Sequence, residues 1–153
     1  MISGEGIVII NSPAKVIFEF ILDLHKYMLA DQKIRKVYEM QPEGDRIKVK
    51  TGGMFRGIAT PPAIQYVTPT AYSRIDVVSK PQTLAHIIMP FTGLFTFEEL
   101  GNNQTRVLHR ETFHPPLPFR WLIEPLLSDW LAQDVPAEMA LLKKLIEEGI
   151  PEQ

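Results

Sequence analysis

The sequence predicts an α+β fold in which a mainly antiparallel sheet meets one long C-terminal helix. Short β-rich segments, separated by glycine, proline and asparagine turns, follow one another between positions 34 and 114. From about 119 to 148, apolar residues recur every three or four positions, which is the helical period. Successive strands followed by a helix are typical of α+β proteins. The 153 residues fit one domain over 1–153.

The N-terminal part predicts one strand and two short helices. Residues 6–10 are β-branched and end at Asn11-Ser12-Pro13, so they predict the first strand. Ser12 is a suitable N-cap and Pro13 a suitable first residue for a helix over about 13–23. A second short helix is expected near 26–32.

The middle of the chain predicts a succession of strands joined by turns. Pro61-Pro62 suits an edge or a bend, and Gly101-Asn102-Asn103 predicts a hairpin. The expected strand segments are 34–40, 46–51, 54–59, 63–67, 72–79, 84–89, 94–100 and 105–114.

The C-terminal helix is expected to carry one apolar stripe, which ends before Gly149 and Pro151. Pro125 and Pro136 lie inside it and should each kink or interrupt the helix. One helix covers only part of a six- or seven-stranded sheet, so the concave space left over is expected to form a pocket. The stripe consists of Leu127, Leu131, Val135, Met139, Leu142 and Ile146.

Composition excludes several classes of function. The chain has no cysteine, which rules out disulfides, zinc–thiolate sites and cysteine nucleophiles. The net charge of −2, without a basic cluster, argues against nucleic acid as a partner. No apolar run approaches the roughly 20 residues that span a bilayer, and no signal peptide is evident. A cytoplasmic location is therefore expected.

The pattern resembles the START-like superfamily, also called SRPBCC or the polyketide cyclase/dehydrase and lipid transport family. The resemblance covers nearly the whole chain and is carried by segments 8–18, 97–107 and 121–146, with Asp23 and Tyr27. It implies the helix-grip fold, a curved antiparallel sheet wrapped around the C-terminal helix. Many relatives have a tryptophan soon after the tyrosine, whereas residues 28–32 contain no aromatic residue here.

His109 and Glu111 are the main polar candidates. Strand alternation places them on one face with Val107 and Phe113, whose apolar character suggests that this face looks inward. A histidine and a glutamate in an apolar cavity suit a polar anchor for a ligand or a proton-transfer couple. They could also pair only with each other, or face solvent if the parity is reversed.

Further candidates are the apolar residues of the expected pocket wall. Phe95 and Phe97 share one face of their strand, while Pro90 and Gly93 leave the orientation of Phe91 and His86 open. The orientation of Arg74 is also open, although alternation favours solvent. The full set of expected ligand-binding residues is Phe95, Phe97, Val107, His109, Glu111, Phe113, Leu127, Leu131 and Val135.

The first functional hypothesis is binding or carrying of a hydrophobic small molecule, such as a lipid, polyketide or isoprenoid. A cyclase or dehydratase using His109 and Glu111 is the second, and an interaction module without a ligand is the third. No cofactor is expected, and no metal, because the four histidines lack paired ligand spacing. Transient membrane contact through exposed aromatic residues and a monomeric or homodimeric state complete the expectations.

Overall fold

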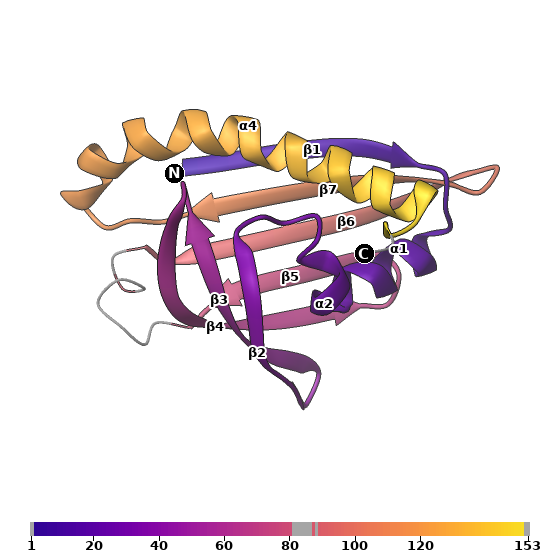
Figure 1. Ribbon diagram of the computed structural model, residues 1–153, viewed down its shortest axis with the longest axis horizontal. Coiled ribbons are helices and arrows are strands. Elements are labelled where there is room, and N and C mark those ends of the chain that lie inside the picture. The colour runs from indigo at the N-terminus through magenta and orange to yellow at the C-terminus, as the bar shows by residue number, and fades with distance from the viewer. Residues whose placement is uncertain (1, 81–86, 88, 152–153) are drawn as a thin grey trace.

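The strands of the described residues join one seven-stranded antiparallel sheet, with a long helix packed along its first strand (Figure 1). The computed structural model describes residues 2–80, 87 and 89–151. The elements are β1 (Ile2–Ile10), α1 (Ala14–Leu22), α2 (Leu24–Tyr27), β2 (Ile34–Glu43), β3 (Arg46–Phe55), β4 (Ile58–Thr70), β5 (Arg74–Ser79), β6 (Phe91–Gly101), β7 (Gln104–Phe113) and α4 (Phe119–Glu148).

The sheet has the strand order β1-β7-β6-β5-β4-β3-β2. The first strand therefore pairs with the last, and the other six form a meander that ends at β2. In Figure 1, β2, β3 and β4 curl away from the plane of β1 and β7, so the sheet is strongly curved. This is the α+β helix-grip arrangement that the sequence predicts.

Several predicted boundaries differ from the structure for local reasons. The expected strand over 54–59 does not exist as one unit, because Arg56 and Gly57 form a two-residue turn with φ of 50° and 82°. Positive φ at both central residues is typical of a type I′ hairpin, which ends β3 and starts β4. The first strand begins at Ile2, earlier than predicted. The predicted strand over 84–89 lies largely outside the described residues.

The long helix α4 matches the predicted range and continues through both prolines. Pro125 and Pro136 are exposed, so the carbonyl groups that lose a helical partner there can be reached by water. The helix bows over the sheet without being interrupted (Figure 1). Among the described residues, no helix is long and apolar enough to cross a membrane.

Two glycines in β1 allow α4 to lie directly on the sheet. A Cβ added to Gly4 would lie 2.6 Å from the backbone oxygen of Leu131, and one added to Gly6 would lie 2.9 Å from the side chain of Met139. Gly4 is paired with Glu111 and Gly6 with His109 across the β1–β7 ladder. The close contact thus brings the helix next to the two predicted polar residues.

Candidate ligand-binding site

A cavity of about 830 Å³ lies in the part of the curved sheet that α4 does not fill. Its walls come from β2 to β7, from residues around α1 and α2, and from residues 123–127 of α4. Most of the lining side chains are apolar. A volume of this size is typical of pockets for small organic ligands.

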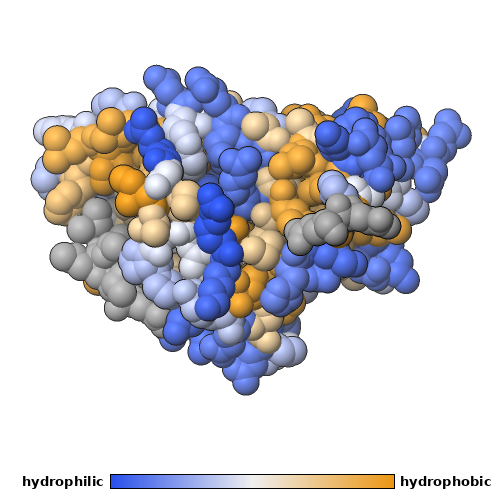
Figure 2. All heavy atoms as spheres, viewed as in Figure 1, coloured by the Kyte–Doolittle hydropathy of each residue, from blue (hydrophilic) through white to orange (hydrophobic). Residues whose placement is uncertain are grey.

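The mouth of the cavity lies between the β3–β4 hairpin and the first half of α4. Ile58 and Leu126 line the cavity and are 73% and 60% exposed, so both reach from its interior to solvent. The Arg56 Nη1 atom donates a hydrogen bond of 3.3 Å to the Leu126 carbonyl oxygen. Figure 2 shows apolar residues gathered at the end of the molecule where α4 begins.

The predicted parity of β7 is correct. His109 and Glu111 are buried at 3% and 2% exposure and line the cavity, and Arg110 between them is exposed. Phe113 and Phe95 line the cavity as well, and the Phe95 ring stacks on the His109 imidazole at 3.9 Å between centroids. The two residues are direct partners in the β6–β7 ladder.

Four predicted lining residues are core residues instead. Phe97 and Val107 belong to the main apolar cluster, and Leu131 and Val135 belong to a second cluster with Ile2. None of the four lines the cavity, whereas Leu127, one helical turn before Leu131, does. For Leu131 and Val135 the reason is the close contact of α4 with Gly4 and Gly6, which leaves no free space beneath residues 131–135.

The sequence left open which way Phe91, Arg74 and His86 point, and the structure describes two of these residues. Phe91 pairs with Phe113 without an intervening bulge and lines the cavity. Arg74 is exposed and forms an ion pair of 2.8 Å with Asp76, so it faces solvent as favoured by alternation. His86 lies outside the described residues.

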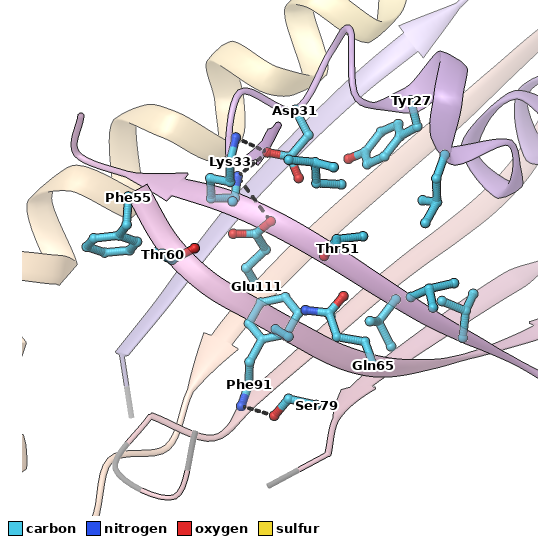
Figure 3. Close-up of a pocket in the computed structure, with 18 of the residues that line it drawn as sticks. Tyr27, Asp31, Lys33, Thr51, Phe55, Thr60, Gln65, Ser79, Phe91 and Glu111 are labelled. Atoms are coloured by element: carbon cyan, nitrogen blue, oxygen red, sulfur yellow. Dashed lines mark hydrogen bonds and ion pairs between the residues drawn. The ribbon is translucent and has the colours of Figure 1, made fainter. Parts of the chain in front are cut away.

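A charged cluster that the sequence did not predict forms the polar wall of the cavity. Its centre is the ammonium of Lys33, which lies just before β2 and is only 16% exposed. Lys33 Nζ is 2.8 Å from Glu138 Oε2 and 3.3 Å from Glu111 Oε1. It also lies 2.9 Å from Asp31 Oδ1 and 2.7 Å from Asp134 Oδ2. Figure 3 shows Lys33, Asp31 and Glu111 converging at one end of the cavity.

Local structure holds Lys33 in this place. The backbone N–H of Lys33 donates to Asp31 Oδ1 at 2.9 Å, a side-chain turn that aspartate often forms two residues before its donor. On the other side, a Cβ on Gly53 would lie 2.5 Å from the Lys33 carbonyl oxygen. Gly53 is therefore needed for the close approach of β3 to the loop that carries the lysine.

His109 connects the charged cluster to the sheet. Its Nδ1 atom lies 3.0 Å from the carbonyl oxygen of Leu94, which can only accept, so Nδ1 carries a hydrogen. Its Nε2 atom faces Glu111 Oε1 at 3.2 Å and Glu138 Oε1 at 3.3 Å. At least one proton must therefore lie among Nε2 and these two carboxyl groups, because three acceptors alone would repel one another.

The two glutamates of the cluster have opposite pKa shifts. Burial acts to raise the pKa of Glu111, but the Lys33 ammonium and the hydrogen bond to His109 outweigh it, so the pKa of Glu111 is lowered. Burial raises the pKa of Glu138 well above its ordinary value. Of the two, Glu138 is therefore the carboxyl group that holds a proton to higher pH. Its Oε1 also accepts a hydrogen bond from the Tyr27 hydroxyl.

A Glu138→Gln variant is expected to change the pH dependence of stability. The folded protein holds the Glu138 proton more tightly than the unfolded chain, whose carboxyl has the ordinary pKa of 4.5. The stabilisation is therefore complete below that pKa and is lost as pH rises, by at most ~1.4 kcal/mol per pH unit. Urea unfolding between about pH 5 and 8 should show the variant gaining stability relative to wild type. A difference that is flat with pH would contradict this protonation state.

Sequence reasoning missed Lys33, Asp31, Asp134 and Glu138. One signal was present in the helix: Glu138 is three residues after Val135 and four before Leu142, so it occupies the apolar stripe. A carboxyl group at such a position is buried and needs a partner. Lys33 gave no such signal, because its burial depends on the approach of α4 and β3.

The same cluster has nitrogen and oxygen atoms that could act as ligands of a metal ion. His109, Glu111 and Glu138 each offer a ligand atom, and these atoms lie within 4.8 Å of one another. The ammonium of Lys33 already contacts both carboxylates. A metal ion bound by these residues would therefore have to displace Lys33.

Comparison with known proteins gives a clear result for the fold. No model of a known family matches the sequence, and no curated protein matches it. The aromatase/cyclase ZhuI from Streptomyces sp. R1128 is similar in structure, with a TM-score of 0.76 and 13% identity over 95% of this chain and 93% of that one. A START superfamily protein from Mycobacterium smegmatis has a TM-score of 0.72 and 16% identity, over 95% and 97% of the two chains.

A truncated norcoclaurine synthase from Thalictrum flavum is also similar, with a TM-score of 0.69 and 13% identity over 95% of this chain and 93% of that one. The chain thus has the helix-grip fold of START-like proteins, as the sequence resemblance implied. Two of these three structures are enzymes with different names, and one is named only by its superfamily. The fold alone therefore does not indicate the function, which has to be argued from the site.

Proposed function

We propose that this protein binds or carries a hydrophobic small molecule in the cavity between its sheet and α4. The cavity of about 830 Å³, with mainly apolar walls and an open mouth, is the observation that carries the proposal. Burial of an apolar ligand contributes about 25 cal/mol per Å² of area removed from water. The charged cluster at one end then orients the ligand. The third hypothesis, an interaction module without a ligand, gives no reason for such a space.

A tryptophan placed inside the cavity should remove binding. Val77 lines the cavity, and its neighbour Val78 is 50% exposed on the opposite face of β5. Val77→Trp should weaken binding of the neutral dye Nile red at least about tenfold, since lost apolar contacts of ~1.4 kcal/mol suffice for that. Val78→Trp is the matched control and should bind as wild type does. Equal binding by both variants, measured by fluorescence titration, would mean that the dye binds elsewhere.

Native mass spectrometry of protein purified from its source should identify the ligand itself. The expected result is a co-purifying apolar molecule that is absent from Val77→Trp and present in Val78→Trp. Protein that carries nothing, and that binds no dye, would contradict a binding function.

An acid–base enzyme of the cyclase or dehydratase kind is the second candidate. The observation in its favour is that His109 Nε2 lies 3.2 Å from Glu111 Oε1 and 3.3 Å from Glu138 Oε1 beside the cavity. A general acid and a general base side by side could transfer protons to and from a bound ketone or alcohol. This hypothesis expects His109→Ala to abolish conversion of the extracted ligand while leaving its binding largely intact. A carrier expects no conversion by the wild-type protein.

The mouth of the cavity also supports a transient contact with a membrane surface. We define the apolar rim as Ile58, Trp121, Leu122 and Leu126, which are 60–75% exposed around or near the mouth. Exposed apolar groups beside a ligand entrance suit delivery from a lipid bilayer.

Leu122→Glu should abolish co-flotation with phosphatidylcholine vesicles. The control is Leu100→Glu, which changes an exposed leucine at the end of β6 far from the mouth. If neither protein floats, and sedimentation instead shows a dimer that Leu122→Glu dissociates, the rim is a homodimer interface.

A further inference from the structure

The polar wall of the cavity contains a buried acceptor without a partner. Among the described residues, Glu111 Oε2 is the one buried side-chain nitrogen or oxygen atom that makes no hydrogen bond. The Glu111 side chain is 3% exposed and projects from β7 into the cavity (Figure 3). A buried acceptor left unsatisfied costs about 1–3 kcal/mol, and more when it is charged. An occupant that donates a hydrogen bond at this point removes that cost.

The neighbouring lysine is already surrounded by carboxyl groups of the protein. An ammonium has three N–H groups. Lys33 Nζ donates hydrogen bonds to Asp134 Oδ2 and Glu138 Oε2 at 2.7 and 2.8 Å. Asp31 Oδ1 and Glu111 Oε1 lie 2.9 and 3.3 Å from the same atom, so four carboxyl groups already surround the ammonium. A ligand carboxylate could bind Lys33 only by displacing one of these partners.

The other polar groups of the wall are also engaged with one another. His109 Nδ1 donates to the Leu94 carbonyl oxygen, and Nε2 faces Glu111 and Glu138. The Tyr27 hydroxyl donates to Glu138. Although this wall contains a lysine, a histidine and a tyrosine, the group that it leaves without a partner is an acceptor on the Glu111 carboxylate.

We infer that the ligand is an apolar molecule with a hydroxyl group, that this hydroxyl donates to Glu111 Oε2, and that carboxylic acids are rejected. This inference rests on the proposed binding function. A hydroxyl fits better than an ammonium, because Lys33 already lies 3.3 Å from the other oxygen of the same carboxylate. A second cation there would meet a like charge in a buried site.

Three ligands with the same alkyl chain test the inference on the wild-type protein. The affinities of 1-dodecanol, dodecyl methyl ether and dodecanoate are measured by displacement of Nile red at about pH 7.5, where the acid is ionised. The alcohol should bind about 10- to 100-fold more tightly than the ether, since a hydrogen bond to a charged group contributes ~1.5–3 kcal/mol. Dodecanoate should bind most weakly.

A Glu111→Gln variant separates recognition by this residue from the general tendency of each ligand to leave water for an apolar cavity. Its amide can donate as well as accept, so dodecanoate should gain affinity relative to the alcohol. Glu98→Gln changes an exposed glutamate of β6 and should leave the wild-type order unchanged. The wild-type series remains decisive if Glu111→Gln does not fold.

The outcomes distinguish a failure of the proposed binding function from a failure of recognition by Glu111. If no ligand displaces the dye, or the dye does not bind, the binding function itself is wrong. If all three bind and the alcohol has no advantage over the ether, the function stands and recognition by Glu111 is wrong. Tighter binding of dodecanoate than of dodecanol by wild type would also overturn the inference.

Discussion

Lys33→Met is expected to lower the free energy of unfolding by about 3–5 kcal/mol, which is the usual cost of breaking a buried ion pair by removing one partner. Lys33 is the cation that the described structure places among Asp31, Glu111, Asp134 and Glu138. Without it, these groups are left close together and short of compensating charge. Urea unfolding at neutral pH measures the loss.

Two further measurements make the Lys33 result specific. Lys144→Met changes an exposed lysine of α4 for which the described part of the chain offers no ion pair, and should alter stability by less than about 0.5 kcal/mol. Adding Glu111→Gln to Lys33→Met removes one stranded charge and should recover part of the lost stability. A loss below about 1 kcal/mol for Lys33→Met would mean that solvent screens the cluster.

Gly4→Ala is expected to be the second most harmful substitution, at about 3 kcal/mol, the upper part of the usual range for overpacking. The added methyl group would lie 2.6 Å from the backbone oxygen of Leu131. A backbone atom cannot relieve this clash by a change of rotamer, as a side chain could. The helix must therefore move away from β1. The same movement should shift Glu138 relative to Lys33, so ligand binding should weaken as well.

Ile7→Ala is the matched control for Gly4→Ala. It lies in the same strand, is 55% exposed on the outer face, and should cost about 1 kcal/mol or less. Thermal and urea unfolding of the two variants measure the difference. Equal stability losses would show that strand propensity, rather than contact with α4, governs position 4.

Local patterns were sufficient to predict the class of fold and much of its detail. Period-2 alternation placed His109 and Glu111 on the inner face, and the 3.6-residue period gave α4 its range, because each pattern follows from backbone geometry alone. Strand ends were predicted less well. They depend on single turns such as Arg56-Gly57, where a non-glycine residue takes a positive φ.

A pocket is present, as expected, but four of the nine residues predicted to line it are core residues instead. The sequence shows that Leu131 and Val135 are apolar and face inward, but not whether they meet another side chain or open space. The answer came from Gly4 and Gly6, which let the helix pack directly on β1, so that the cavity lies beside the helix on the same inner face of the sheet. Interior volume is a property of how elements dock, not of any one segment.

The sequence by itself determined an antiparallel sheet, a covering helix and an inward-facing histidine and glutamate, because these follow from short-range periodicity and turn chemistry. Only the tertiary structure decided that Lys33 is buried against carboxyl groups from a loop, a strand and a helix up to 105 residues away. The field of such distant charges sets which groups hold protons and which donors are engaged. The unpartnered oxygen of Glu111, and with it the chemistry of the ligand, therefore belongs to the assembled fold.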